Sequence, residues 1–333
     1  MTHAAPAGAP HRPTARRRTL AALALAGLVT ASGAAIAQER AVKLILPVAT
    51  ASGVDTITRA AQPALAKALG HPVVVENQPG AGGIVGTQAL VKSPPDGYTL
   101  SIVSNNHVIY PSVYKSLPFD PVADITPIAV IGSTPIVLVV NPKVPAKNAQ
   151  ELIALLKAKN GEMNYASSGN GTILHLAAAM FLDETGTTAK HIPYKGVGPM
   201  LTDLIGGQVD FATSSLPSVQ QHIKSGALRA IGVGAAQRVA AAPEIPTMAE
   251  QGVPTYLVEG WFAGIGPAKM PAAEVARVRD AFAAAFATPE VKEAMAKQGN
   301  TIDVGTTAAA EKFFPAELAK YAKLVKKAGV ELQ

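Results

Sequence analysis

Small polar residues gather at one place in the sequence, the stretch SSGNGT at residues 167–172. The run after it repeats apolar residues at helical spacing, and residues 163–166 before it can form a short strand. A strand, a polar turn and a helix in this order would leave backbone N–H groups and hydroxyls pointing at one place. That arrangement suits an anion. A capped turn of the kind found in any α/β protein is the alternative.

Three more turns of small polar residues follow expected strands. They are TASGVD at residues 50–55, SNNH at 104–107 and TSSLPS at 213–218. These turns offer donors from the backbone and from hydroxyls, without a set of acid, base and activated nucleophile. Their recurrence at strand ends therefore favours a binding protein over a catalyst.

The glycine-rich turn PGAGGIVGT at residues 79–87 is the strongest enzymatic signal. Gly80 and Gly82 fit a dinucleotide fingerprint, but Val85 occupies the position of the third glycine. No acidic residue ends the following strand to hold a ribose, and no lysine follows Gly86 as a phosphate loop requires. An exported nucleotide-dependent enzyme that uses the turn from Gly80 to Gly86 stays open as an alternative function.

Nucleophilic and metal chemistry has little support in the sequence. The chain contains no cysteine and no G-x-S-x-G motif, and its later histidines never occur in H-x-x-x-H spacing. We therefore expect no catalytic residue, no metal site and no cofactor. His175 is the one histidine of interest, because it follows Thr172 by about one helical turn and could point back to the same turn.

The N-terminal residues have the three parts of a secretory signal peptide. Three arginines at residues 16–18 precede an uncharged run over residues 20–36, and small residues lead to a cleavage site between Ala37 and Gln38. We expect residues 1–37 to be removed and the mature protein to be periplasmic, by general or twin-arginine export. Without cysteine, neither a lipid anchor nor a disulfide can form.

The apparent basicity of the chain comes mostly from this leader. The full sequence has 29 Lys+Arg and 23 Asp+Glu, and four of those arginines lie in the leader, which leaves 25 against 23. So small an excess does not resemble a nucleic-acid-binding surface. The remaining length suffices for two domains of ordinary size.

Strand-like and helical patterns alternate along the rest of the chain. This βαβ rhythm predicts an α/β fold with a mainly parallel sheet. Strands are expected at residues 42–48, 71–78, 97–106, 163–166, 189–196, 209–212 and 261–265, and two more within 128–142, divided at residues 133–135. Helices are expected at residues 55–70, within 80–94 after its glycine-rich turn, at 148–161 with Gly161 as the C-cap, at 272–298 and at 308–328, with a short one at 245–252.

The pattern restarts near Val140, which predicts two lobes joined by crossing segments. We expect residues 38–140 and 262–333 to form lobe 1 and residues 141–261 to form lobe 2, the tail packing on lobe 1. Ligands of open α/β sheets bind beyond the carboxyl ends of the strands, so the cleft between the lobes is the expected site. Export, two lobes and a donor-lined cleft together predict a solute-binding protein for a small carboxylated molecule.

Several long stretches resemble one family, the Bug-type periplasmic solute receptors of the tripartite tricarboxylate transporters. The stretches are VVVENQPGAGGIVGTQALVKSPPDGYTL, PSVYKSLPFDPVADITPIAVI, VLVVNPKVPAKNAQELIA, NYASSGNGTILHLAAAMF, HIPYKGVGPMLTDLIGGQVDF and LRAIGVGAAQRVAAAPEIPTMAEQGVP. The resemblance implies a type II periplasmic-binding-protein architecture, two α/β lobes with the ligand cleft between them. It also implies a monomer that binds a dicarboxylate, tricarboxylate, aromatic acid or amino acid and delivers it to a two-subunit membrane permease. A ligand-loaded sensor for a signalling partner is a further alternative.

The resemblance also implies which residues contact the ligand. They are Ser52, Gly53, Asp55, Ser104, Asn105, His107, Ser167, Ser168, Gly169, Thr172, His175, Tyr194, Lys195, Ser214 and Ser215. Among these, the hydroxyls of the SSGNGT turn are expected to hold a carboxylate. The chain departs from its relatives in the first loop, where Val54 stands in place of a threonine and Ala51 in place of a glycine. We therefore expect a ligand that is bulkier or less polar at that end than a simple dicarboxylate.

Overall fold

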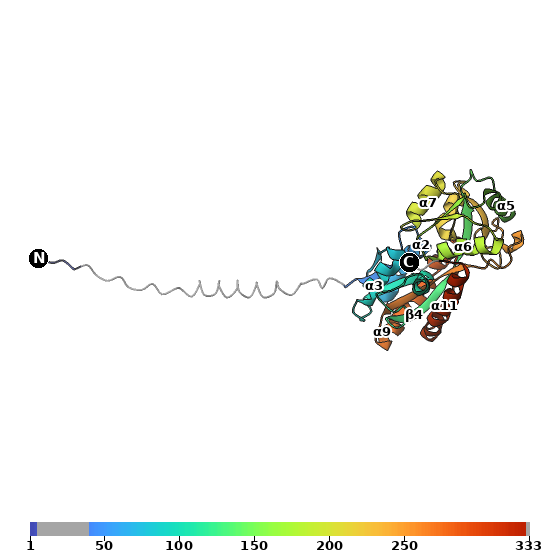
Figure 1. Ribbon diagram of the computed structural model, residues 1–333. Coiled ribbons are helices and arrows are strands. Elements are labelled where there is room, and N and C mark those ends of the chain that lie inside the picture. The colour runs from blue at the N-terminus through green and yellow to red at the C-terminus, as the bar shows by residue number, and fades with distance from the viewer. Residues whose placement is uncertain (5–39, 331–333) are drawn as a thin grey trace. The chain divides into compact units, whose positions relative to one another are not determined.

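The computed structural model describes residues 1–4 and 40–330, so the expected cleavage site after Ala37 lies outside the described residues. Ten strands of this part form one curled sheet, shown with its helices in Figure 1. No helix of the described residues combines the length and the apolar character that a membrane span needs.

The first half of the sheet contains three parallel strands and two antiparallel ones. Its order is β2 (Val73–Asn77), β1 (Val42–Leu46), β3 (Thr99–Ser104), β9 (Glu259–Pro267) and β4 (Ile125–Val140). The first three are parallel, and β9 runs antiparallel to both β3 and β4. We call this half of the sheet and the helices packed on it lobe 1.

The second half of the sheet is built on the end of β4. Residues 136–140 of β4 pair antiparallel with β7 (Phe211–Ser215), and 137–140 also with β8 (Arg229–Val233). Beyond β7 lies β5 (Asn164–Ser167), which pairs parallel with β7. Beyond β5 lies β6 (Lys190–Pro193), which pairs parallel with β5. We call this half and its helices lobe 2.

Strand β4 corrects two expectations. Residues 133–135 do not divide it, because it is one strand of 16 residues that exchanges partners there. Pro135 still pairs with β9, while Ile136 already pairs with β7. The expectation of a mainly parallel sheet is wrong at its centre, since β4 is antiparallel to every strand it meets, including β10 (Thr301–Ile302). One strand thus carries the chain from lobe 1 to lobe 2, and the division of residues between the lobes stays a prediction.

The helices cover both halves of the sheet, and Figure 1 shows α5, α6 and α7 around the second half. Lobe 1 carries α2 (Gly53–Leu69), α3 (Ile84–Val91), α4 (Asn106–Ile109), α9 (Ala272–Phe286), α10 (Pro289–Lys297) and α11 (Thr307–Lys327). Lobe 2 carries α5 (Ala149–Lys159), α6 (Ile173–Thr185), α7 (Val197–Gly206) and α8 (Leu216–Lys224). Short 3-10 turns span Ala81–Gly83, Tyr110–Ser112 and Ala249–Gln251.

Three local predictions about helices are wrong for identifiable reasons. The helix expected over 272–298 breaks into α9 and α10, because Pro289 starts a new helix at its first turn. Helix α5 ends at Lys159 and its C-cap is Asn160, which adopts a left-handed conformation with φ 43°, so Gly161 is not the C-cap. The segment expected as a short helix forms only the 3-10 turn at Ala249–Gln251. The tail behaves as expected, since α11 packs on α4 and β4.

Candidate ligand-binding site

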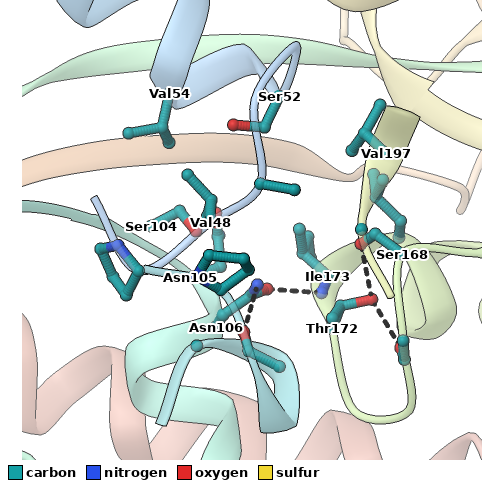
Figure 2. A pocket seen from close by; sticks show the side chains of 18 of the residues that line it. Val48, Ser52, Val54, Ser104, Asn105, Asn106, Ser168, Thr172, Ile173 and Val197 are labelled. Atoms are coloured by element: carbon teal, nitrogen blue, oxygen red, sulfur yellow. Dashed lines mark hydrogen bonds between the residues drawn. The ribbon is translucent and has the colours of Figure 1, made fainter. Parts of the chain in front are cut away.

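A cavity of about 580 Å³ lies where strand ends and helix N-termini of the two lobes meet. Figure 2 shows side chains of both lobes around it, with Val54 and Ser52 facing Val197 and Ser168. Ten of the expected contact residues line it: Ser52, Gly53, Ser104, Asn105, Ser168, Gly169, Thr172, Tyr194, Lys195 and Ser215. The expected cleft between the lobes is therefore present as a cavity. Five of the expected residues, Asp55, His107, Ser167, His175 and Ser214, do not line it.

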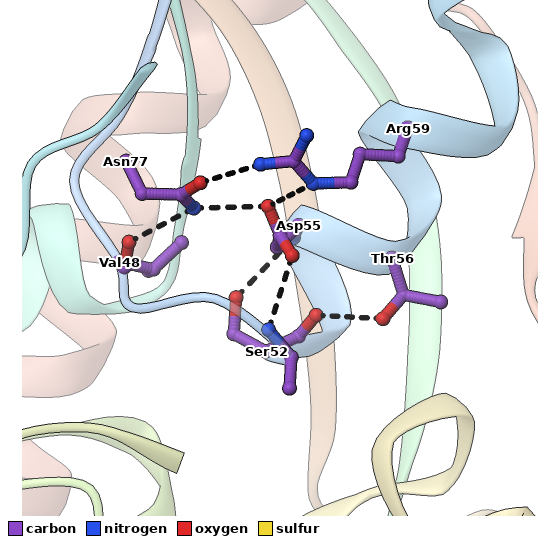
Figure 3. Close-up of polar contacts among 7 residues, drawn as sticks. Val48, Ser52, Asp55, Thr56, Arg59 and Asn77 are labelled. Carbon is purple, nitrogen blue, oxygen red and sulfur yellow. Dashed lines mark hydrogen bonds and ion pairs between the residues drawn. The ribbon is translucent and has the colours of Figure 1, made fainter. Parts of the chain in front are cut away.

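Asp55 lies in the first turn of α2 and belongs to the network of polar contacts in Figure 3. One carboxylate oxygen accepts from Ala51 N at 3.0 Å, and the other accepts from Arg59 Nε and Asn77 Nδ2, both at 2.9 Å. Both oxygens therefore bond within the protein, and Asp55 shapes the loop before α2 instead of lining the cavity.

The other four residues also lie outside the cavity lining, each in different surroundings. His107 is buried on α4 with its Nε2 2.6 Å from Pro121 O, and burial lowers its pKa to about 4. Ser214 is fully buried in β7, and its hydroxyl has no partner among the described residues. Ser167 and His175 belong to the support of the SSGNGT turn. A position directly after a strand therefore does not ensure that a side chain reaches the cavity.

The SSGNGT turn uses its hydroxyls on itself. Thr172 is the N-cap of α6: its Oγ1 accepts from His175 N and donates to Gly169 O at 2.8 Å. Ser168 Oγ donates to Thr172 Oγ1 at 3.2 Å, as Figure 2 shows. Ser167 Oγ lies 2.7 Å from His191 Nε2. In this arrangement the hydroxyls expected to hold a carboxylate serve first to shape the turn.

Two stacked histidines support that turn from behind. The rings of His175 and His191 lie 3.8 Å apart at 9°, and Tyr165 stacks on His191 at 4.9 Å. His175 Nδ1 accepts from Gly171 N at 3.2 Å. Burial lowers the pKa of His191 to about 4, and burial together with the neighbouring His191 lowers that of His175 to about 3. Both rings are therefore neutral at pH 7 and hold the turn as hydrogen-bonding, stacked groups.

Helix N-termini of both lobes meet at the cavity. The lining includes the first residues of α2 (Gly53), α6 (Ile173) and α7 (Val197), and the N-caps of α3 (Gly83) and α8 (Ser215). The N–H groups of a first helical turn have no acceptor within the helix, and the helix dipole makes them attractive to negative charge. In α6 the amides of Ile173 and His175 already bond Asn106 and Thr172, so α6 contributes mainly its dipole, while α2 and α7 also offer backbone N–H groups to an anion.

Two lining residues that organise the site, Asn106 and Trp261, were missed by the sequence analysis. Asn106 Oδ1 accepts from Ile173 N at 2.8 Å, a direct bond from lobe 1 to lobe 2 (Figure 2). Asn105 Oδ1 accepts from Trp261 N, and Trp261 Nε1 donates to Glu317 of α11, so the C-terminal helix supports the cavity floor. Two features of the sequence could have identified these residues: Asn106 lies inside the SNNH turn, and Trp261 is the one tryptophan of the chain.

The glycine-rich turn also lines the cavity, without the features of a nucleotide site. A Cβ at Gly86 would lie 2.7 Å from Gln78 O and 2.8 Å from Pro47 Cα, so close packing accounts for that glycine. Lys195 is the one charged residue among those lining the cavity. The described residues contain no group of three or more His, Cys, Asp or Glu that could hold a metal.

Comparisons with known proteins agree with this geometry. Residues 57–330 match the Tripartite tricarboxylate transporter family receptor. The chain belongs to this family. BugT of Bordetella pertussis is 34% identical over 313 residues, which cover 93% of this chain and 96% of BugT.

Two solved structures are similar over most of their length. The periplasmic binding protein BugD has a TM-score of 0.85 and 31% identity, covering 89% of this chain and 99% of BugD. An adipate-bound protein of R. palustris has the same TM-score and 28% identity, and the match covers 89% of this chain and 100% of the R. palustris chain.

The comparisons confirm the expected fold class and the receptor role, and they rule out the enzymatic alternative. The chain has the periplasmic-binding-protein fold, and it is a solute-binding receptor of a periplasmic family. Because its relatives and structural neighbours are binding proteins, it is not an enzyme, and the nucleotide-dependent alternative is wrong.

Proposed function

We propose that this receptor captures a small organic acid by closure of the two lobes and delivers it to a two-subunit membrane permease. The observation that carries the proposal is the meeting of the α2, α6 and α7 N-termini at one cavity that contains a single charged residue. Backbone N–H groups bind a carboxylate without any conversion of the ligand. The adipate complex of the R. palustris relative supports a carboxylate as the recognised group.

The charge of the carboxylate is the property to test. The melting temperature of the purified receptor is measured with a panel of organic acids, with their methyl esters and with nucleotides. We expect stabilisation by at least one acid and by neither its ester nor a nucleotide, because only the acid supplies an anion to the helix N-termini. Equal stabilisation by acid and ester would contradict carboxylate recognition.

A matched pair of variants locates the donors. The first turn of α2 offers the amides of Gly53 and Val54, and the Ser52 hydroxyl accepts from Asp55 N while its own proton has no acceptor among the described residues. We expect Ser52→Ala to weaken binding of the acid about tenfold to a hundredfold, the effect of one hydrogen bond to a charged group. Ser93→Ala, on the far end of α3, removes a hydroxyl bonded to Ala89 O and should leave affinity unchanged.

Export, delivery and oligomeric state each have a direct measurement. N-terminal sequencing of the periplasmic fraction should begin at Gln38 if residues 1–37 are removed. Light scattering of the purified receptor should give the mass of one chain. Uptake of the radiolabelled acid should need both the receptor and the permease, and uptake without the receptor would contradict the delivery role.

A further inference from the structure

Contacts between the lobes lie on two sides of the cavity. On one side the loop before α2 meets the loop before α7, since a Cβ on Gly196 would overlap Ala49 Cβ. On the other side the SSGNGT turn meets lobe 1, where Asn106 Oδ1 accepts from Ile173 N at 2.8 Å. Figure 2 shows Ser52 on the first side and Asn106 on the second. The cavity therefore has two ends, which we call the Gly196 end and the Asn106 end.

The Gly196 end attracts the carboxylate of the proposed function, on which this inference rests. Helix α7 begins directly after Gly196, and α2 begins directly after Ser52 in the facing loop. Both helices present backbone N–H groups and the positive end of a helix dipole. Lys195, the one charged residue in the cavity lining, precedes Gly196 and adds a positive charge that has no partner among the described residues.

Tyr114 supplies a hydroxyl at the Asn106 end. Its amide donates to Tyr110 O at 2.9 Å, and the two rings pack edge to face with their centroids 6.4 Å apart. Tyr110 OH donates to Gly82 O at 3.0 Å, and Asn106 Nδ2 donates to the same oxygen at 3.3 Å. The ring of Tyr114 is thus held beside the glycine-rich turn, and it lines the cavity there.

The Tyr114 hydroxyl lies where the two lobes face each other. A Cβ on Gly82 would lie 3.6 Å from Tyr114 OH and 3.6 Å from Asn170 O, so the three residues surround one point. Gly82 has a φ of 70°, a conformation that favours glycine, and its missing side chain leaves this point open. A ligand atom there would meet the Tyr114 hydroxyl of lobe 1 and the SSGNGT turn of lobe 2.

This hydroxyl is available as a donor. It has no hydrogen-bond partner among the described residues, whereas the side chain of Asn106 is engaged through both its oxygen and its nitrogen. Burial raises the pKa of Tyr114 above its ordinary value, so the hydroxyl keeps its proton at pH 7. A half-buried donor without an acceptor is unfavourable, and an oxygen atom of the ligand can supply the acceptor. Ser104, whose hydroxyl also lines the cavity without a partner among the described residues, offers a further donor from lobe 1.

We propose that Tyr114 is a specificity-determining residue whose hydroxyl donates to an oxygen atom at the end of the ligand remote from its carboxylate. That oxygen belongs to a hydroxyl, a carbonyl or a second carboxylate. The carbon body between the two ends suits the apolar side chains of the lining, such as Val48 and Val197. The ligand is thus an organic acid with an oxygen function at each end.

Sets of matched acids test this by titration calorimetry. Butyrate, hexanoate, octanoate and 3-phenylpropionate are each compared with the acid that carries a hydroxyl at the far end and with the acid that carries a carboxylate there. Several lengths are needed because the distal oxygen must reach Tyr114 while the first carboxylate stays at the Gly196 end. We expect at least one acid with a distal oxygen to bind about fivefold more tightly than its plain counterpart, the effect of one hydrogen bond.

The variant Tyr114→Phe then shows whether the hydroxyl is responsible. It keeps the ring that packs on Tyr110 and removes one oxygen, so the advantage of the distal oxygen should fall below about twofold. Tyr98→Phe is the matched control, because Tyr98 does not line the cavity and its hydroxyl lies 3.3 Å from His71 Nε2. This control should keep the full advantage.

Two results would overturn the inference and leave the proposed function standing. One is that the plain acid binds as tightly as its distal-oxygen counterparts in every set, and the other is that the advantage stays above about twofold in Tyr114→Phe. If no acid with a distal oxygen binds, the inference is wrong as well. The melting temperatures with the panel of acids and esters then decide whether the proposed function stands.

Discussion

Gly53, in the first turn of α2 of lobe 1, lies against Ser215 of lobe 2, and replacing it tests the proposed closure. A Cβ at this position would lie 2.6 Å from Ser215 Oγ and 3.0 Å from Ser215 Cβ. Ordinary contact begins at 3.4 Å, so Gly53→Ala requires the lobes to separate by about 0.8 Å or the side chain of Ser215 to move. The backbone of Gly53 itself is helical, and alanine fits it without strain.

The magnitude follows from the cost of overpacking. An extra methyl group in a tightly packed contact costs about 1–3 kcal/mol. If that cost falls on the closed state alone, ligand affinity drops roughly fivefold to 150-fold. The cost of this overpacking does not affect the folding of each lobe by itself. Alanine in a helix is favoured over glycine by up to about 1 kcal/mol. We therefore expect weaker binding together with unchanged or slightly higher stability of the ligand-free protein.

The assay combines calorimetry with the best-binding acid and urea denaturation without ligand. Gly198→Ala is the control, because a Cβ there meets no atom within 4 Å although it also lies in the first turn of a helix. The double variant Gly53→Ala, Ser215→Gly should recover part of the lost affinity, since it removes the opposing atoms. Affinity of Gly53→Ala within twofold of the wild type would refute the argument that these two residues meet in the liganded state.

Three further predictions follow from single contacts. Asn106→Ala leaves Ile173 N without its acceptor across the lobes, so calorimetry should show affinity about tenfold lower with little change in ligand-free melting. Tyr321→Phe leaves Asn105 Nδ2 short of a buried partner and should lower the free energy of unfolding by about 1–3 kcal/mol in urea titrations. Acid should destabilise the protein between pH 6.5 and 4, because unfolded histidine binds a proton near pH 6.5 whereas folded His191 and His107 do so only near 4. His191→Gln should lower the slope of unfolding free energy against pH by up to about 1.4 kcal/mol per pH unit. An unchanged slope would contradict the assignment of this pH dependence to His191.

The sequence was informative where structure depends on neighbouring residues. The polar turns after β1, β3, β5 and β7 all lie at the cavity or directly behind it, because a parallel βα unit brings its turn to the carboxyl edge of the sheet. Helix α6 begins at the SSGNGT turn as expected, since Thr172 is a favourable N-cap.

The features that local patterns could not supply depend on residues far apart in the chain. His191 reaches Ser167 only because β6 pairs with β5, and its spacing from the turn carries no signal. Asp55, expected as a ligand contact from the resemblance, is bonded by Asn77 of the neighbouring strand β2, a contact that no local pattern indicates. The exchange of partners within β4 likewise depends on where β9 ends and β7 begins. Such pairings decide which polar atoms remain free for a ligand.

The direct contacts between the lobes account for how closure can depend on the ligand. Among the described residues an exposed ion pair crosses between them, Lys327 Nζ to Asp183 Oδ2 at 3.8 Å, and so do two hydrogen bonds, Ile173 N to Asn106 Oδ1 and Ser218 Oγ to Ala51 O. Each hydrogen bond contributes a net of about 0.5–1.5 kcal/mol, which is too little to hold two lobes together against the cost of ordering them. A ligand that meets α2 from one lobe and α7 from the other adds contacts that exist only in the closed state. Because such a ligand binds the closed state more tightly than the open state, it raises the fraction of molecules that are closed. The few direct bonds between the lobes define the geometry of that closed state.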